Sequence, residues 1–368
     1  MKIKKIFYIA NIRMPTERAH GIQVAQMCAA FARHGAVVTL LVPDRKTLPD
    51  DPFSYYGMER LFNIERLPVP DVVRLGEIGF IVESLIFAQR CARRARGEPD
   101  AIVYTREELP LLFLPRGRAF YEAHQLRGSF ALRFALKRAA GIVAITEGLK
   151  SVIVTLGYPR ERVLVAHDGY DEKAFAAAVS KKEARRRLGL SEEKKIALYI
   201  GGLEAWKGPQ TLCEAAPALA KDGVSVVIIG GAAEALKRYR ARYPLAAFLG
   251  PRSYVTLPLI QQAADVLIVP NASAKQGSVY ASPLKLFAHM ASGIPLVVSD
   301  VPAIREVLSE SEAEFFAPDE AESLALAVRR ALLETGKAKA EAALKKSILF
   351  TWDKRAQSVL AYIRALSE

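Results

Sequence analysis

The chain has 368 residues, of which 51% are apolar and 25% are charged, as is ordinary for a globular protein of about two domains. Three cysteines far apart in sequence exclude a disulfide framework and a thiolate metal site, and they fit a reducing cytosol. The net charge of +13 favours anionic ligands. The sequence has no apolar run long enough for a membrane-spanning helix.

Strand-like apolar runs alternate with helix-like runs in the first part of the chain. The predicted strands cover residues 6–11, 37–43, 101–106, 119–124, 141–146 and 162–169. The predicted helices include Gly21–His34, Ile78–Arg96, Ser129–Ala139 and Glu147–Leu156. Many of these strands are apolar throughout, which is typical of a parallel sheet with helices on both faces.

The same alternation continues in the second part. Its predicted strands cover residues 195–202, 224–231, 246–250, 265–271, 295–300 and 313–318. Its predicted helices include Pro209–Ala220, Ala233–Tyr243, Ser282–Ala291, Pro302–Leu308 and Asp319–Leu333. We therefore expect an α/β protein with two doubly wound, Rossmann-like parallel-sheet domains that face a cleft.

A polar stretch without strand signals, residues 171–195, marks the seam between the two predicted domains. We expect a first domain at residues 1–172 and a second at residues 173–350. Residues 351–368 follow no further strand, and we expect them to form a helix that crosses back onto the first domain.

The first candidate for chemistry is the segment Gly201–Gly208, which lies between a strand and a helix. Its glycines allow a phosphate to approach the backbone, the helix start offers free N–H groups, and Lys207 adds a positive charge. The segment has neither a Walker A nor a GxGxxG pattern, which disfavours a nucleoside triphosphatase or an ordinary dehydrogenase. The alternative is a plain strand-to-helix turn with a solvated lysine.

The second candidate is the helix start Ser282–Lys285. Ser282 suits the N-cap position and Pro283 the first helical position. Lys285 in the first turn opposes the helix dipole, which a bound anion would explain. The alternative is an amphipathic helix whose lysine points into water.

The third candidate is His124, at the carboxyl end of the predicted strand 119–124. A histidine there can donate or accept a hydrogen bond at a reacting centre, or can simply be bonded at a strand end. The other histidines have no metal-ligand spacing, and the sequence has no HExxH or CxxC motif, so we expect no metal site.

The basic stretch Arg90–Arg138 holds eleven basic and five acidic residues, a balance of +6. Together with the apolar residues that precede it, the stretch suits an anionic membrane surface, or else forms solvated helices. No nucleic-acid motif accompanies it, and we expect no nucleic-acid partner.

Several segments, taken in order, resemble the retaining family 4 glycosyltransferases (glycosyl transferases group 1), which have the GT-B fold. The likeness covers nearly the whole chain, from a first loop that leads into Gly21 to the final helix. The segments are YTRE, YEAH, GIVAITEGLK, HDGYDEKAF, YIGGLEAWKG, SPLKLFAHMASGIPLVVSDVPAIREVL and TWDKRAQSVL.

The resemblance implies a UDP- or GDP-type nucleotide diphosphate sugar on the second domain, a sugar or lipid-linked acceptor on the first, and no obligatory metal or other cofactor. It assigns catalysis to His124 and Lys207 and the nucleotide ribose region to Ala288. It places Arg13 and Arg106 on the acceptor side. The residues that it assigns to the donor diphosphate are Gly21, Gly201, Gly202, Lys207, Ser282, Pro283, Leu284 and Lys285.

Two departures from the family pattern concern the donor site. Gly202 stands where many members have an arginine, and Tyr280 and Ala288 stand where many have a pair of glutamates. We expect a retaining glycosyltransferase of glycan or glycolipid synthesis, located in the cytoplasm and peripherally on the inner face of the cell membrane. The alternatives are a non-catalytic sugar-nucleotide-binding paralogue and a nucleotide-sugar epimerase of the same fold.

Overall fold

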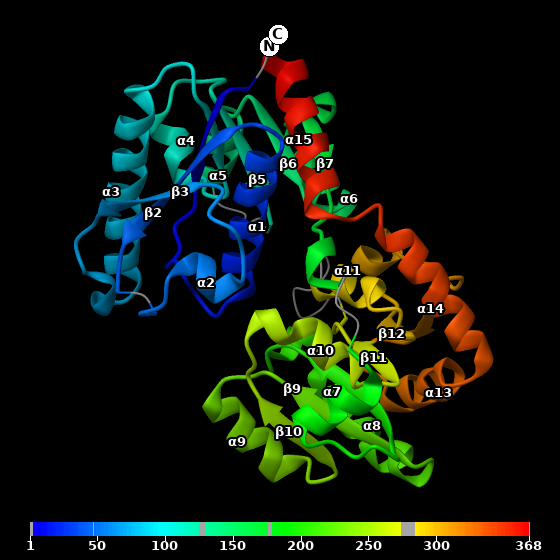
Figure 1. Cartoon of the computed structure of the whole chain (residues 1–368). Coiled ribbons are helices and arrows are strands. Elements are labelled where there is room, and N and C mark those ends of the chain that lie inside the picture. Colours follow the sequence, from blue (N-terminus) through cyan, green and yellow to red (C-terminus); the bar gives the residue numbers. More distant parts are fainter. Residues whose placement is uncertain (1–2, 47, 125–129, 176–178, 274–283, 368) are drawn as a thin grey trace. The chain divides into compact units, whose positions relative to one another are not determined.

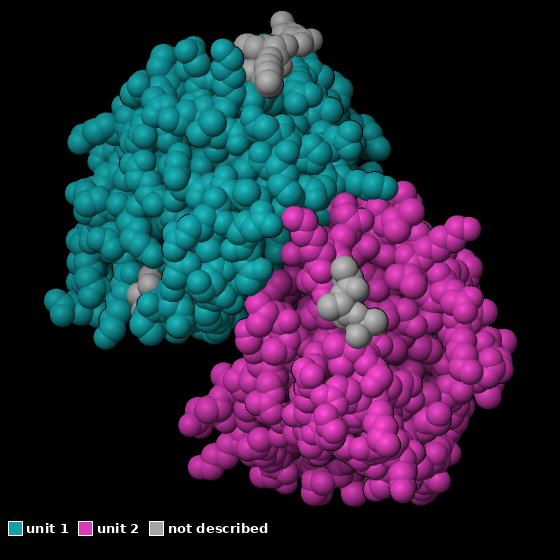
Figure 2. Space-filling model, in the orientation of Figure 1, with its two compact units in different colours: residues 1–168, 352–368 teal, residues 169–351 magenta. Residues whose placement is uncertain are grey.

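The computed structural model describes residues 3–46, 48–124, 130–175, 179–273 and 284–367. The chain forms two compact units, shown in different colours in Figure 2. Unit 1 comprises residues 1–168 and 352–368, and unit 2 comprises residues 169–351. The change of unit therefore falls after Asp168, a few residues before the seam expected from the sequence, and again after Thr351.

In unit 1, the described residues form a parallel sheet of seven strands in the order β3-β2-β1-β4-β5-β6-β7. The strands are β1 (Lys5–Ile9), β2 (Val37–Asp44), β3 (Asn63–Pro68), β4 (Ile102–Thr105), β5 (Ala119–Ala123), β6 (Gly141–Ala144) and β7 (Val163–Val165). The helices are α1 (Ala19–Arg33), α2 (Pro52–Tyr56), η1 (Val73–Leu75), α3 (Glu77–Arg96), α4 (Leu109–Phe113), α5 (Phe130–Leu136), α6 (Glu147–Thr155), η2 (Arg160–Arg162) and α15 (Trp352–Ser367).

In unit 2, a second parallel sheet has six strands among the described residues, in the order β10-β9-β8-β11-β12-β13. The strands are β8 (Lys195–Ile200), β9 (Val224–Ile229), β10 (Ala246–Gly250), β11 (Val266–Val269), β12 (Leu296–Ser299) and β13 (Glu314–Phe316). The helices are η3 (Glu172–Phe175), α7 (Lys181–Leu188), η4 (Ala205–Lys207), α8 (Pro209–Lys221), α9 (Ala233–Arg242), η5 (Tyr254–Thr256), α10 (Leu257–Gln262), α11 (Leu284–Ala291), α12 (Pro302–Arg305), α13 (Ala321–Ala331) and α14 (Glu334–Ser347).

The apolar strands are explained by cores on both faces of each sheet. Along β8, Ile196 and Leu198 belong to one apolar cluster, while Ala197 and Tyr199 belong to the cluster on the opposite face. Successive side chains of a strand point to opposite faces, so a strand covered on both sides must be apolar at every position. The predicted fold class, two Rossmann-like parallel-sheet domains, is confirmed.

Among the elements absent from the sequence-based prediction are the short helices α2, α4 and α10, and also β3, α7 and α14. The edge strand β3 reads NIERLP and is mostly accessible to solvent, so it lacks the apolar run of the central strands. The helices α7 and α14 are rich in charge and alanine and bury only small parts of their surfaces. Their weak apolar periodicity explains why the prediction missed them.

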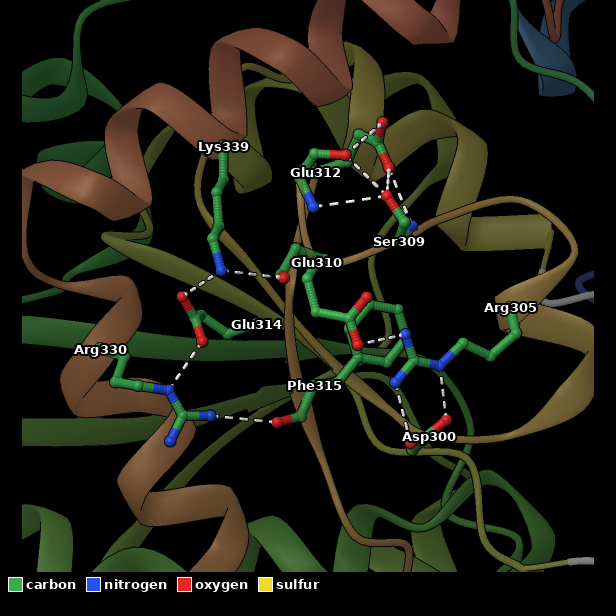
Figure 3. A network of polar contacts seen from close by, with 11 residues as sticks. Asp300, Arg305, Ser309, Glu310, Glu312, Glu314, Phe315, Arg330 and Lys339 are labelled. Atoms are coloured by element: carbon green, nitrogen blue, oxygen red, sulfur yellow. Dashed lines mark hydrogen bonds and ion pairs between the residues drawn. The ribbon is translucent and has the colours of Figure 1, made fainter.

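The edge strand β13 is held by charged side chains rather than by apolar burial alone (Figure 3). Arg330 of α13 and Lys339 of α14 donate to the two carboxylate oxygens of the nearly buried Glu314 at 2.7 and 2.6 Å. At the other end of the network, Arg305 donates to both oxygens of Asp300 at 2.6 and 2.9 Å. The bonds to Glu314 attach α13 and α14 to the edge of the sheet.

The helix α15 follows unit 2 in sequence and packs on α1 and β6 of unit 1 (Figure 1), as the predicted fold class has it. The hydroxyl of Tyr362 donates to the carbonyl of Arg162 at 2.6 Å and accepts from the N–H of Ile142 at 3.1 Å. Gly141 permits this approach, because a Cβ atom there would collide with the Tyr362 hydroxyl.

An ion pair also joins α15 to the interior of the sheet. Arg355 lies 3.5 Å from a carboxylate oxygen of Glu122 on β5 and donates to the carbonyl of Ala166 at 3.2 Å. Both charged side chains are almost completely removed from solvent, at 2% and 0% exposure. A buried ion pair of this kind is costly to break on one side only.

Arg355→Met should therefore destabilise unit 1 by about 3–5 kcal/mol, because the Glu122 carboxylate would stay buried without its cation. Arg364→Met, an exposed position on the same helix, should change the free energy of unfolding by less than about 0.5 kcal/mol. Urea unfolding of both variants measures the difference. Similar effects from the two substitutions would show that the buried pair does not anchor α15.

Candidate functional site

Each sheet has one point at which the strand order reverses. In unit 1 the reversal lies between β1 and β4, and in unit 2 it lies between β8 and β11. In open parallel sheets, ligands bind outside the carboxyl ends of the strands at such points. The segments that follow these four strands are therefore the places to look for a site.

In unit 2, the loop after β8 packs closely onto the end of β11. Gly208 has φ +66°, and a Cβ atom there would clash with the carbonyl of Pro270. The N–H of Ala272 donates to the carbonyl of Trp206 at 3.0 Å. The glycine thus allows the loop that carries Lys207 to lie against the end of the neighbouring strand.

Two lysines face the consecutive glycines at the end of β8. A Cβ atom on Gly201 would lie 3.2 Å from Nζ of Lys285, and one on Gly202 would lie 2.9 Å from Nζ of Lys207. Neither position has room for a side chain, because a Cβ atom on Gly201 would first meet the hydroxyl of Tyr199 and one on Gly202 the carboxylate of Glu204. Two ammonium groups beside the backbone of two glycines suit an anion with several oxygens, such as a diphosphate.

Lys285 has an unusual environment for a cation. Its Nζ atom is buried without a hydrogen-bond partner in the described part of the chain, and it lies 4.0 Å from the ring centroid of Tyr199. Burial, and then the nearby charge of Lys207, lowers the pKa of Lys285 well below its usual value. An anion that reached this nitrogen would supply the missing hydrogen bond and the opposing charge.

Glu204 is a residue that the sequence analysis did not single out. Its carboxylate lies 3.0 Å from Nζ of Lys207. Burial alone would raise the pKa of Glu204, but the hydrogen bond from Lys207 lowers it. A Cβ atom on Gly202 would collide with this carboxylate, so Glu204 occupies the space in which a Gly202 side chain would begin.

Asn271, directly after β11, is a second residue that the sequence did not reveal. Its side chain is 1% exposed, and both its amide oxygen and its amide nitrogen lack hydrogen-bond partners among the described residues. Buried amides without partners are rare in folded proteins and need a reason. Its position at the strand reversal makes it a candidate ligand group.

The helix-start residues Ser282 and Pro283 lie outside the described residues. The structure begins α11 at Leu284, so the predicted N-cap at Ser282 stays a prediction. Ala288 is 5% exposed and belongs to an apolar cluster. His289 beside it is buried, and its Nδ1 atom lies 2.7 Å from Nε2 of Gln261.

In unit 1, the carboxylate of Glu122 is the centre of a buried polar network. Gln23 of α1 donates to it at 2.6 Å and Tyr104 of β4 at 2.5 Å, and His124 bonds to it directly. Burial alone would raise the pKa of Glu122, but the charge of Arg355 and the bond from His124 hold it well below its usual value. A glutamate within an otherwise apolar predicted strand is the sequence signal that could have revealed this network.

His124 is held in one tautomer by this network. Burial, and then the charge of Arg106, lowers the pKa of His124 against the opposing effect of Glu122. The ring is therefore neutral at pH 7, and its Nε2–H donates to the Glu122 carboxylate. Its Nδ1 atom is then left as a hydrogen-bond acceptor.

Arg106 lies beside the same network. It donates to the side-chain oxygen of Gln23 at 2.5 Å, so Gln23 connects Arg106 to Glu122. Burial, and then Arg106, lowers the pKa of His20 to about 4. Arg106 is thus the principal positive charge beside two neutral histidines.

A cavity of about 370 Å³ opens beside these residues, and we call it the α3–β4 cavity. Its walls come from the ends of β1, β4 and β5, from α1 and α4, and from one face of α3. Its polar lining is Asn11, His20, Ser84, Arg106, Glu107, Glu108, Tyr121 and His124. The carboxyl group of Glu107 accepts from the N–H of Asn11 at 3.0 Å, and burial raises the pKa of Glu107.

The remaining predicted residues of unit 1 lie apart from this lining. Arg13 is exposed and lies 3.8 Å from Glu17. Gly21 is buried in α1, where a Cβ atom would collide with the hydroxyl of Tyr56 and with Thr16. This packing is sufficient to require a glycine, whatever else approaches its backbone.

The basic stretch Arg90–Arg138 is bonded in part to its own unit. Five of its described arginines donate to groups of unit 1: Arg94, Arg96, Arg106, Arg118 and Arg138. These side chains fasten strands and helices together rather than form a free cationic face. Among the described helices, none is long and apolar enough to cross a bilayer.

Comparison with known proteins finds one family match and several similar sequences. Residues 194–334 match the family described as glycosyl transferases group 1. The chain is 27% identical over 219 residues to the D-inositol 3-phosphate glycosyltransferase of Mycobacteroides abscessus, covering 56% of this chain and 47% of that protein. The match thus spans about half the length of that relative.

Solved structures show the same fold over the full chain. The Anabaena protein Alr3699/HepE in complex with UDP and glucose has a TM-score of 0.76 at 17% identity, covering 98% of this chain and 100% of that one. Sucrose-phosphate synthase of Thermosynechococcus elongatus has a TM-score of 0.78 at 19% identity, covering 99% of each chain. The architecture is therefore GT-B.

The buried histidine of unit 2 generates a stability prediction. Burial, and then Lys285, lowers the pKa of His289 to about 3. Between the ordinary histidine pKa of about 6.5 and that value, the unfolded state binds more protons than the folded state. Its stabilising contribution is thus complete above pH ~6.5 and is lost as the pH falls, by up to ~1.4 kcal/mol per pH unit.

His289→Gln keeps an acceptor for Gln261 but cannot titrate, so its free energy of unfolding should fall less steeply with acid. Urea unfolding at several pH values between about 4 and 7 measures the two slopes. Identical slopes would show that His289 does not control the acid sensitivity of unit 2.

Proposed function

We propose that the protein is a retaining glycosyltransferase that moves a sugar from a nucleotide diphosphate sugar, of UDP or GDP type, to an acceptor in glycan or glycolipid synthesis. One observation carries the proposal: Lys207 and Lys285 face consecutive glycines at the strand reversal of unit 2, and Nζ of Lys285 has no partner among the described residues. The match of residues 194–334 to glycosyl transferases group 1 covers this segment.

In this proposal, the two lysines stabilise the negative charge that develops on the leaving diphosphate. Gly201 and Gly202 admit the phosphates, and Leu284 lies at the start of α11. Ser282 and Pro283, outside the described residues, are proposed as further diphosphate ligands. Gly21 of unit 1 also contributes to diphosphate binding. The lysines supply the positive charge that a metal would otherwise provide, so no obligatory metal belongs to the proposal.

The groups of unit 1 serve the transferred sugar and the acceptor. His124 offers Nδ1 to a sugar hydroxyl, because Glu122 takes its Nε2–H. Arg106 lines the α3–β4 cavity and would bind the acceptor there, with Arg13 on the same side of the reaction. The location that suits a nucleotide-sugar donor is the cytoplasm, with peripheral attachment to the membrane.

A non-catalytic sugar-nucleotide-binding role is the second candidate, and two observations favour it. Glu204 forms an ion pair with Lys207, and Ala288 provides no carboxylate for a ribose. Consumption of a sugar donor distinguishes the two roles. Binding of UDP or GDP sugars without any transfer would support the second role, and conversion of the donor into an isomer would point to an epimerase.

Lys207→Ala should lower turnover by at least ~100-fold, because it removes a cation that acts on developing charge. Turnover is measured as nucleoside diphosphate released from a panel of UDP and GDP sugars. Lys221→Ala, an exposed lysine at the end of α8, is the matched control and should retain activity. Full turnover in a folded Lys207→Ala protein would remove Lys207 from the mechanism.

Glu204→Gln should bind UDP about 3–10-fold more tightly, because the phosphates would no longer compete with a carboxylate for Lys207. The gain should shrink at high salt. Calorimetry compares this variant with Glu214→Gln, which removes an exposed acid of α8 and changes the net charge equally. Unchanged or weaker UDP binding in Glu204→Gln would contradict a diphosphate site at Lys207.

A further inference from the structure

One face of the helix α3 carries large apolar side chains in solvent. Ile78 is 76% exposed and Ile81 is 54% exposed, and Leu75 of the neighbouring η1 is 69% exposed. We call this surface the α3 apolar face; its members are Val73, Leu75, Ile78, Ile81, Val82 and Leu85. Contiguous exposed apolar residues, unlike scattered ones, mark a binding surface.

The spacing of these residues makes the surface continuous. Ile78, Ile81, Val82 and Leu85 follow the i, i+3, i+4, i+7 pattern and lie on one side of the helix. The opposite side, with Phe87 and Cys91, is buried in the core of unit 1. In the first half of α3 the buried residues are Gly79, Glu83 and Ser84, so the large apolar side chains of that half face solvent.

Close backbone packing holds η1 beside this helix. A Cβ atom on Gly79 would collide with the carbonyl of Val72, so the glycine lets the two elements touch. Gly76, at φ +77°, makes the turn between them, and the N–H of Phe80 donates to its carbonyl at 3.0 Å. The apolar residues of η1 and α3 thus form one fixed surface rather than a loose loop.

The α3 apolar face leads into the α3–β4 cavity. Ile81 belongs to both, and Phe80, Phe87 and Ala88 of the same helix also line the cavity. The opposite wall is polar and holds Arg106 and His124. A ligand that extended from one to the other would need an apolar chain joined to a hydrogen-bonding end.

The charges near the face favour a lipid over a second copy of this cationic chain. Beyond Leu85 the solvent-facing residues of α3 include Arg90 and Arg93, both exposed, and neither has an ion-pair partner among the described residues. Free arginines beside an apolar surface suit the boundary of an anionic lipid. They would repel the same face of another molecule of net charge +13.

We propose that the acceptor is an amphiphile, whose apolar chain lies on the α3 apolar face while its polar end enters the α3–β4 cavity. This inference rests on the proposed glycosyltransferase function, because it names the class of acceptor for that reaction. It places the recognition of the chain on unit 1 alone.

The test measures binding of n-hexyl, n-octyl and n-decyl β-D-glucoside by calorimetry, each below its critical micelle concentration. Each fully buried methylene should strengthen binding about fourfold, so partial burial of the four extra groups should make the decyl probe at least ~10-fold tighter than the hexyl probe. Equal affinities across the series would overturn the proposal.

Ile78→Ser combined with Leu85→Ser should abolish the dependence on chain length, because both side chains lie in solvent at the centre of the face. Leu326→Ser combined with Leu333→Ser is the matched control, since these residues are also exposed but lie in unit 2. The control should keep the full dependence. Persistence of the dependence in the α3 variant would place the apolar chain elsewhere and overturn the proposal.

UDP binding, measured on the same proteins, separates this inference from the proposed function. Normal UDP binding with no chain-length dependence would overturn the amphiphilic acceptor alone. Chain-length dependence without binding of UDP, GDP or their sugars would overturn the proposed transferase function. Concentration-dependent dimers that the α3 variant abolishes, in sedimentation, would assign the face to a second copy and overturn the proposal.

Discussion

The buried carboxylate of Glu122 is the constraint on which unit 1 depends. A charge in the middle of a sheet is stable only when opposite charge and hydrogen-bond donors surround it. Here Arg355 of α15, Gln23 of α1, Tyr104 of β4 and His124, which directly follows β5, do so. One requirement thus fixes the position of the last helix, the neighbouring strands and the orientation of the histidine beside the cavity.

In unit 2, two buried polar groups without partners lie at the strand reversal. Nζ of Lys285 and the amide of Asn271 are buried without partners in the described residues, and the backbone of Gly201 lies beside Lys285. Such groups cost stability in the empty protein, and a ligand that satisfies them regains it on binding. The ion pair of Glu204 with Lys207 limits that cost for one of the two cations.

Much of the fold could be predicted, because continuous apolar strands such as β8 record burial on both faces of a parallel sheet. The sequence also located the loops after strands, and hence Lys207 and His124. It could not show that Glu204 fills the space beside Gly202, since that contact depends on the path of the loop. It suggested a cationic surface at Arg90–Arg138, whereas in the fold several of those arginines donate hydrogen bonds to carbonyl and carboxylate groups of unit 1.

The division of the chain has a consequence for synthesis on the ribosome. Unit 1 begins the chain, yet it is completed only by α15, which follows the whole of unit 2. Until Arg355 emerges, a sheet formed from the first 168 residues would enclose the Glu122 charge without its principal cation. The first unit to be translated is therefore the last to reach its full stability, and unit 2 can fold beside a partner that is still incomplete.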